Sequence, residues 1–242
     1  MKLIIIRHGD PDYINDTLTE RGWKEAESLS CRLVNEPADY YYVSCMGRAK
    51  DTASCTLKKM NRTAIELEWL REFQGKAIKP HIPDKPSIAW DWMPKDWMQE
   101  KRYYHLETCF EPGPFSSLNS EEQYDWVCRN FDDLLEKHGY KRNDQWYDAI
   151  TPNEDTVVFF CHFAVQCVLI SHLLNISPMI LWHGLCAAPT SVTKIVTEER
   201  EKGIASFRML YFGDISHLIE NGIEPSFAAR FCECYENLAQ RH

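Results

Sequence analysis

The most constraining feature of this sequence is a pattern that occurs three times: a short apolar segment ends at a strongly polar residue, and a helical pattern follows. The apolar segments are residues 2–6 (KLIII), 39–45 (DYYYVSC) and 156–161 (TVVFFC). Apolar segments of this length are typical of strands buried in a parallel sheet. The polar residues that follow them are Arg7 with His8, Arg48, and His162. Because ligands bind beyond the carboxyl ends of such strands, we expect these residues to share one pocket.

The remaining patterns complete an α/β fold. Apolar residues at helical spacing predict helices over 18–34, 49–60, 120–138 and 164–174. Two further strands are expected at 191–196 and 204–212, joined as a hairpin by the polar turn 198–203. We predict a three-layer sandwich in which helices flank a mostly parallel central sheet.

Residues 76–118 differ in character from the rest of the chain. They contain six prolines and no sustained period, together with the aromatic residues Trp90, Trp92, Trp97, Tyr103, Tyr104 and Phe110. Long irregular segments inside compact domains are usually functional lids or disordered inserts, and six aromatic residues argue against disorder. We therefore expect residues 1–242 to form a single domain with an aromatic lid inserted at about 76–118. Its tryptophans are either lid core or a platform for substrate.

Charge and hydropathy exclude several classes of partner. The 242 residues contain 27 Lys and Arg against 36 Asp and Glu, a formal net charge of −9, without a basic run. Because nucleic acids are bound mainly by clustered Lys and Arg, we expect no nucleic-acid partner. A small anionic substrate is compatible, since a few arginines in a pocket act locally. The stretch 157–174 divides into a strand and a helix, and the N-terminal apolar run is too short for a signal peptide. We expect no membrane association and a cytoplasmic location.

Ten cysteines are scattered along the chain. A chain of this length does not need disulfides as its scaffold, so we expect reduced and mostly buried thiols. Cys232 with Cys234, and Cys161 with His162, are conceivable metal ligands, but the Cys-x-x-Cys spacing of structural zinc sites is missing. We expect no metal site.

Several motifs together resemble the histidine phosphatase superfamily, in the branch that contains cofactor-dependent phosphoglycerate mutase and its phosphatase relatives. They are Arg7-His8-Gly9 after the first strand, Ser44-x-x-x-Arg48-Ala49-x-x-Thr52-Ala53, and the late strand that ends at His162. Three shorter segments are also similar to family members: Leu18-Thr19-Glu20-Arg21-Gly22, Leu70-x-Glu72-x-x-Gly75 and Gly213-Asp214-Ile215-Ser216-His217-Leu218. The resemblance covers most of the chain except the lid.

The resemblance implies a mechanism in which His8 is the nucleophile and forms a phosphohistidine. Arg7, Arg48 and His162 would hold the phosphoryl group and oppose its charge in the transition state. Glu72 is the best match for the acid that protonates the leaving oxygen, with Asp10 and Asp91 as weaker alternatives. Side chains would supply all of the electrostatics, so we expect neither metal nor cofactor.

Three departures from the family pattern bear on the reaction. Phe163 stands where the family commonly has glycine, and its ring would narrow or redirect the pocket. Ile14 stands where relatives often have a polar residue that contacts phosphate. The loop that mutases carry after Arg-His-Gly is replaced by residues 11–17, which favours a phosphatase over a mutase.

The sequence therefore predicts a phosphomonoesterase that hydrolyses a small phosphorylated metabolite through a phosphohistidine. One alternative is a phosphoglycerate mutase-type phosphoryl transfer, which requires a site that keeps water from the phosphorylated enzyme. The other is a non-catalytic protein that binds phosphate for regulation. The expected partner is a small phosphate ester. The sequence determines neither the natural substrate nor the oligomeric state.

Overall fold

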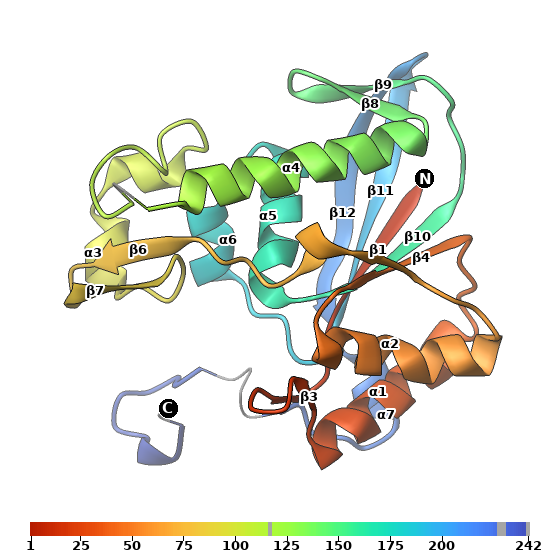
Figure 1. The fold of residues 1–242 in the computed structure, drawn as a ribbon, viewed down its shortest axis with the longest axis horizontal. Helices are drawn as coiled ribbons and strands as arrows, with labels where there is room; N and C mark the ends of the chain where they lie inside the picture. The colour runs from red at the N-terminus through yellow and green to blue at the C-terminus, as the bar shows by residue number, and fades with distance from the viewer. Residues whose placement is uncertain (116–117, 227–230, 241–242) are drawn as a thin grey trace.

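The computed structural model describes residues 1–115, 118–226 and 231–240. Its centre is a sheet whose eight strands are β1 (Lys2–Arg7), β4 (Tyr40–Ser44), β5 (Ile65–Leu67), β8 (Tyr140–Asn143), β9 (Trp146–Ala149), β10 (Thr156–Cys161), β11 (Val192–Glu201) and β12 (Ile204–Asp214). Their order across the sheet is β5-β4-β10-β1-β11-β12-β9-β8 (Figure 1). Two-stranded pairs are formed by β2 (Pro11–Asp12) with β3 (Thr17–Leu18) and by β6 (Lys76–Lys79) with β7 (Ile82–Ile88).

The sheet changes from parallel to antiparallel at β1. Ile4 pairs with Val158 of β10 in parallel and with Lys194 of β11 in antiparallel register. Strands β5, β4, β10 and β1 are parallel, as predicted for the sheet core. The other half is antiparallel because β11 and β12 form a hairpin, whose short connection requires that direction. The turn predicted over 198–203 is wrong in extent: β11 continues to Glu201, and the charged residues lie along the strand.

Helices cover both faces of the sheet, which gives the predicted three layers. One face carries α1 (Glu20–Leu33), α2 (Gly47–Met60) and α7 (Ser216–Glu220). The other carries α4 (Ser120–Lys137), α5 (Phe163–Leu174) and α6 (Pro178–Gly184) (Figure 1). Side chains of β1 alternate between the layers: Ile4 packs with Leu29 of α1, and Ile5 lies in the core that includes Phe131 of α4. Burial of each such side chain contributes about 1.5–3 kcal/mol.

Residues 76–118 contain more regular structure than the sequence predicted. The hairpin β6–β7 opens the segment, and α3 (Pro94–Met98) and the 3-10 turn η2 (Lys101–Tyr104) follow. Other 3-10 turns are η1 (Glu68–Leu70) and η4 (Leu238–Gln240). The segment has a core of buried aromatic side chains, namely Trp92, Trp97, Tyr103, Phe110 and Phe115. Residues 116 and 117 of the predicted lid lie outside the described residues. The single domain with an inserted lid stays a prediction.

Two further expectations concern the cysteines and the membrane. None of the ten cysteines, all of which lie in the described part of the chain, forms a disulfide, but the prediction that most are buried is wrong. Four are buried and four are exposed, because Cys31 lies on the outer face of α1 and Cys232 and Cys234 lie in the exposed C-terminal segment. No helix in the described part of the chain combines the length and the apolar character that crossing a bilayer needs.

Candidate active site

The ends of β1 and β10 bring two histidines together. The backbone N–H of His8 donates to the carbonyl of Cys161 at 2.9 Å, which aligns the last residues of the two strands. The imidazole rings of His8 and His162 then lie with centroids 5.0 Å apart, and both rings are buried. Two junctions that are separated by more than half of the chain therefore meet at the carboxyl edge of the sheet.

Hydrogen bonding leaves one nitrogen of His8 available for attack. Nδ1 lies 2.7 Å from the carbonyl oxygen of Gly9, which can only accept, so Nδ1 carries the proton and Nε2 keeps its lone pair. Burial, followed by the charges of Arg7 and Arg48, holds the pKa of His8 well below its usual value, although the Gly9 bond opposes this. A neutral imidazole with a free Nε2 is a competent nucleophile.

The loop after His8 is fixed by close backbone packing. The N–H of Gly9 donates to the hydroxyl of Thr52 at 2.9 Å, and this hydroxyl donates to the carbonyl of Arg48 at 2.7 Å. A side chain at Gly9 would come within 2.8 Å of the carbonyl oxygen of Gly22, so the approach of α1 requires glycine here. The loop that follows His8 and the start of α2 are thereby held by one hydroxyl.

Two arginines place positive charge beside the histidines. Arg7 donates to the carbonyl of Ala187, and Arg48 donates through Nη1 to Oδ1 of Asp16 at 2.6 Å. In the described structure, the Nε atoms of both arginines are buried without a hydrogen-bond partner. Buried donors normally have an acceptor, and a planar guanidinium matches the oxygens of a phosphoryl group. The arginines can therefore bind an anion without first losing internal bonds at Nε.

His162 is oriented by a serine at the end of β4. Its Nε2 lies 2.8 Å from the hydroxyl of Ser44, which accepts from the N–H of Met46 at 3.3 Å and can donate its own proton to the ring. That arrangement leaves the proton on Nδ1, which is buried without a partner among the described residues. Burial, then the charges of His8 and the arginines, keeps the pKa of His162 well below its usual value. A neutral His162 can donate from Nδ1 to a phosphoryl oxygen.

Glu72 is attached to the first turn of α5. Its Oε1 accepts from the N–H groups of Ala164 and Val165, both at 3.1 Å, and from Phe73 at 2.9 Å. These bonds all use Oε1, which leaves Oε2 to carry a proton. Burial raises the pKa of Glu72, while the backbone bonds and the charges of Arg7 and Arg48 oppose the rise. A carboxyl group held in this way can act as an acid near the arginines.

The two alternative acids are placed differently. Both carboxylate oxygens of Asp10 accept hydroxyl protons, from Thr19 and from Ser226, so Asp10 holds the loop to α1 and to the C-terminal segment. Asp91 is exposed, belongs to the predicted lid and lines a neighbouring cleft. The contacts therefore favour Glu72 over either aspartate as the acid.

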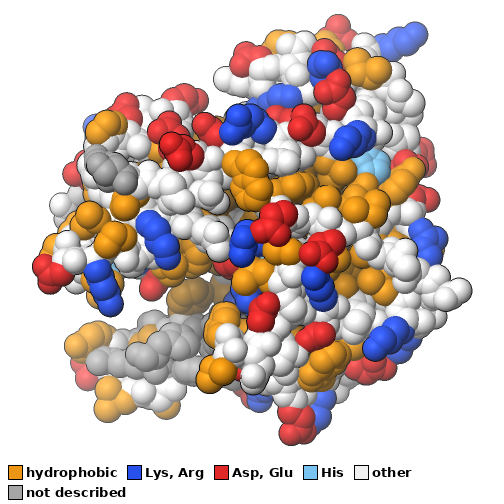
Figure 2. All heavy atoms as spheres, viewed as in Figure 1, with side chains coloured by type: hydrophobic (Ala, Val, Ile, Leu, Met, Phe, Trp, Pro, Cys, Tyr) orange, Lys and Arg blue, Asp and Glu red, His pale blue; other side chains and the backbone are white. Residues whose placement is uncertain are grey.

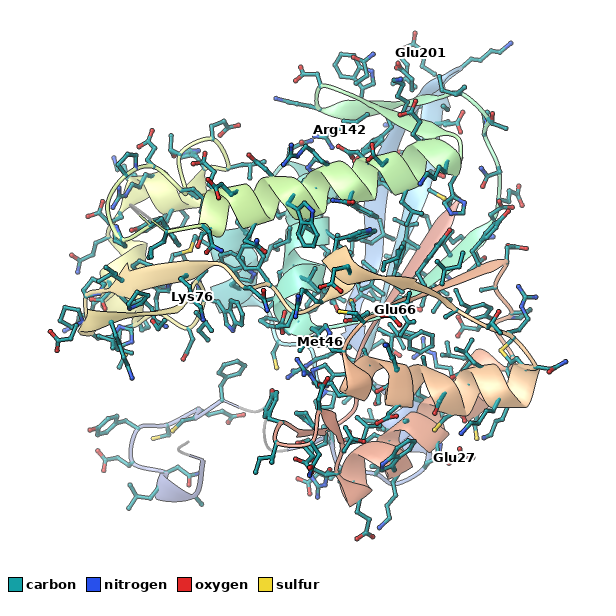
Figure 3. All side chains as sticks on the ribbon, viewed as in Figure 1. Glu27, Met46, Glu66, Lys76, Arg142 and Glu201 are labelled. Atoms are coloured by element: carbon teal, nitrogen blue, oxygen red, sulfur yellow. The ribbon has the colours of Figure 1, made fainter. Side chains whose placement is uncertain are left out.

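Two residues of the site were not singled out in the sequence. Asp16 binds Arg48 and also accepts the N–H of Gly47 at 2.7 Å, at the start of α2. Met46, labelled in Figure 3, lies beside Arg48 and Glu72, with its sulfur 3.5 Å from Arg48 Nη2 and 3.5 Å from Glu72 N. The Asn15-Asp16 turn was the available signal for the first, whereas a methionine carries no such signal.

The metal interpretation of the cysteines gains no support from the contacts. Among residues 1–115, 118–226 and 231–240, no three His, Cys, Asp or Glu side chains are grouped so that they could hold a metal ion. The thiol of Cys232 is directed to the carbonyl of Cys234 at 2.9 Å.

A cleft of about 460 Å³ is lined both by Arg7 and by side chains of the aromatic segment. Arg7 and Phe163 lie close together in its lining, and Trp90, Trp92 and Trp97 also line it. Figure 2 shows a hollow beside the aromatic segment, with apolar side chains on the side that this segment forms. Of the two roles left open by the sequence, Trp92 and Trp97 fit the first, because they are buried in the core of the segment. All three tryptophans also line the cleft.

Comparison with known proteins gives one family and several similar folds. The model of the histidine phosphatase superfamily (branch 1) matches residues 3–109. A phosphoserine phosphatase from Entamoeba histolytica, solved with phosphoserine, has a TM-score of 0.59 and 19% identity, and the match covers 90% of this chain and 98% of that one. No curated protein sequence matches the chain significantly.

Two other solved structures share the fold. The mycobacterial glucosyl-3-phosphoglycerate phosphatase has a TM-score of 0.59 and 16% identity, with 88% of this chain and 98% of that one covered. The alpha-ribazole phosphatase from Shigella flexneri has a TM-score of 0.54 and 17% identity, with 89% and 97% covered. At these identities the similarity establishes the α/β architecture and not the substrate.

Proposed function

Residues 3–109 of this chain belong to the histidine phosphatase superfamily, as the sequence resemblance predicted, and from this premise we propose that the protein is a phosphatase acting on small phosphomonoesters. The observation that carries the proposal is the pair of neutral histidines close to Arg7 and Arg48, with Nε2 of His8 free. The similar folds include phosphatases for phosphoserine, glucosyl-3-phosphoglycerate and alpha-ribazole phosphate, which supports a phosphomonoester as substrate.

In the first step, Nε2 of His8 attacks phosphorus and a nitrogen–phosphorus bond forms. The ester bond between phosphorus and the leaving oxygen breaks, and the proton on Oε2 of Glu72 passes to that oxygen. Arg7, Arg48 and Nδ1–H of His162 bind the three remaining phosphoryl oxygens and stabilise their charge in the transition state.

In the second step, water attacks the phosphorus of the phosphohistidine. Glu72, now ionised, accepts a proton from this water, and the nitrogen–phosphorus bond breaks. His8 returns to its neutral form with the proton still on Nδ1, and inorganic phosphate leaves. The cycle consumes one water for each ester and regenerates every side chain.

The test is to trap the intermediate. Enzyme quenched during turnover of a ³²P-labelled ester is expected to carry an acid-labile, base-stable label, and a His8→Ala variant is expected to lose both label and activity. Release of inorganic phosphate distinguishes this function from the alternatives: a mutase would isomerise phosphoglycerate in the presence of a bisphosphate primer, and a binding protein would release no phosphate. Full turnover by the His8→Ala variant would refute the proposal.

A further inference from the structure

The site described above accounts for the phosphoryl group but not for the alcohol to which it is esterified. The cleft of about 460 Å³ begins at Arg7, so a phosphoryl group bound there can direct its ester oxygen toward the cleft. This volume lies within the usual range for small-molecule sites. Other large clefts, along α2 and between α1 and α7, contain none of the proposed catalytic residues.

Six of the thirteen described residues that line this cleft are Phe or Trp. The indole N–H of Trp92 donates to the carbonyl of Ala89 at 2.7 Å, and that of Trp182 donates to the carbonyl of Ala164 at 3.1 Å. Because these polar atoms already have partners, the two side chains present apolar surface. Trp90 packs against Trp182 with a ring separation of 6.2 Å, and Phe163 lies at the Arg7 end.

A histidine in the wall is held without charge. Nδ1 of His183 lies 2.7 Å from the carbonyl of Met179, while its Nε2 accepts the backbone N–H of Trp92 at 3.0 Å. With one nitrogen donating and the other accepting, the ring is neutral, and burial lowers its pKa. The ring also stacks on Trp97, with centroids 4.9 Å apart, so it fixes the aromatic segment against α6.

The charged residues that line the cleft do not suit a substrate whose alcohol carries an acidic group of its own. Among the described residues that line the cleft, Arg7 is the one Lys or Arg, and the phosphoryl group occupies it. Asp91 adds a carboxylate. A leaving group that carried its own carboxylate or phosphate would therefore meet a negative side chain and apolar rings, and the described lining residues contain no second Lys or Arg to pair with it.

We propose that this cleft binds the leaving group and selects phosphomonoesters whose alcohol carries an aromatic ring and no negative charge. The proposal rests on the proposed phosphatase function and specifies its substrate class. Aromatic side chains in the lining favour an aromatic group through ring–ring contact and burial, and Asp91 disfavours acidic alcohols. Phosphoglycerate-like esters are poor substrates on this basis.

The test compares three esters of primary alcohols, so that the need for a leaving-group proton is similar. We expect kcat/KM for 2-phenylethyl phosphate to exceed that for ethyl phosphate by about tenfold or more, because a filled apolar pocket discriminates strongly. 3-Phosphoglycerate is expected to fall below ethyl phosphate. Equal kcat/KM values for the first two esters would overturn the proposal, whereas no hydrolysis of these esters or of p-nitrophenyl phosphate would refute the phosphatase function itself.

Two variants locate the preference in the cleft. Trp97→Leu should reduce the preference for the phenylethyl ester, whereas Trp146→Leu, at a partly exposed tryptophan on β9, should leave it unchanged. Asp91→Asn should raise the relative rate on 3-phosphoglycerate. If Trp97→Leu fails to fold, the affinities of the unmodified protein for 2-phenylethylphosphonate and ethylphosphonate decide the question. Tryptophan fluorescence measures both. Equal affinity for the two phosphonates would then contradict the proposal.

Discussion

At the scale of single residues, protonation in the site is determined by fixed backbone partners. The carbonyl of Gly9 keeps the proton of His8 on Nδ1, and three N–H groups hold one oxygen of Glu72. The two groups have opposite requirements: His8 must be neutral and Glu72 must be protonated for the first step. The pKa of His8 lies well below its usual value and that of Glu72 lies above its usual value. The arrangement favours activity below the raised pKa of Glu72.

A pH profile tests this assignment. As pH rises through the raised pKa of Glu72, the acid form is lost, so kcat/KM for an alkyl phosphate should fall. Because the pKa of His8 is lowered, mild acid should not protonate the nucleophile. Glu72→Gln should abolish the fall in kcat/KM that follows the deprotonation of Glu72. In single-turnover measurements of alcohol release, it should slow the hydrolysis of alkyl esters much more than that of nitrophenyl esters. Equal losses on both esters would exclude Glu72 as the acid.

The guanidinium of Arg48 is expected to act by geometry as well as by charge. Arg48→Lys keeps the positive charge but loses the planar fork that matches phosphoryl oxygens. We expect a loss of about 2–4 kcal/mol in transition-state stabilisation, measured from kcat/KM. Arg62→Lys is the matched control, since Arg62 binds the carbonyls of Ala38 and Asp39 on the sheet side of α2. A lysine at residue 48 that performs like arginine would show that no directed contact exists.

Asp16 forms an ion pair with Arg48, the arginine that is proposed to bind phosphate. Its carboxylate binds Arg48 at 2.6 Å, and phosphate must share or displace this contact. Asp16→Asn removes the charge but retains an oxygen that can accept the N–H of Gly47. We expect inorganic phosphate to inhibit this variant about threefold to tenfold more tightly, because a competing anion is gone. Weaker inhibition would instead show that Asp16 holds Arg48 in its binding position.

At the scale of secondary-structure elements, α1 supports the loop that carries the nucleophile. Glu25 is buried on the inner face of α1 and accepts the N–H of Asp10 at 2.8 Å. Burial raises the pKa of Glu25 to about 7, with a smaller contribution from the charge of Asp10. A carboxyl whose pKa is higher in the folded state stabilises the fold at low pH, and this contribution is lost as pH rises from about 4.5 to about 7.

Glu25→Gln removes that dependence while keeping an oxygen for the Asp10 N–H. Relative to the unchanged protein, the variant should gain stability between pH 5 and pH 8, by up to about 3 kcal/mol in the free energy of unfolding. Urea denaturation at the two pH values measures the difference. Glu27→Gln, on the outer face of the same helix, is the control and should show little change. A pH-independent difference for Glu25→Gln would contradict the buried carboxyl.

The sequence predicted the elements whose pattern reports burial directly. Strands β1 and β10 are apolar between their end residues, and their predicted bounds match the structure to within one residue. The hairpin β6–β7 escaped prediction because Pro83 and Pro86 interrupt β7, yet both are tolerated in a strand that pairs on one side. The hairpin β8–β9 was not predicted because each of its strands has only four residues. Each strand buries one tyrosine, Tyr140 or Tyr147, and a single buried residue forms no recognisable alternation.

At the scale of the whole molecule, the pocket depends on contacts between distant parts of the chain. His8, Arg48 and His162 could be placed together because parallel strands bring their carboxyl ends to one edge. The position of the aromatic segment could not be derived in this way, because His183 holds it through a contact with Trp92, 91 residues away in the sequence. Likewise, no periodic pattern connects Asp16 with Arg48. The meeting of these candidate site residues was therefore predictable, whereas the walls of the cleft beside them were not.

The position of β1 has a consequence for synthesis on the ribosome. Its two neighbours in the sheet, β10 and β11, are translated roughly 150 residues or more after it. Until then, a continuously apolar strand has neither partner, and such an exposed strand is a binding site for chaperones and for other nascent chains. In a ribosome-bound chain that stops before residue 192, β1 could pair with β10 on one side, but its other edge would be open because β11 is missing. Although His8 emerges early, its surroundings are completed only when the last third of the protein has been made.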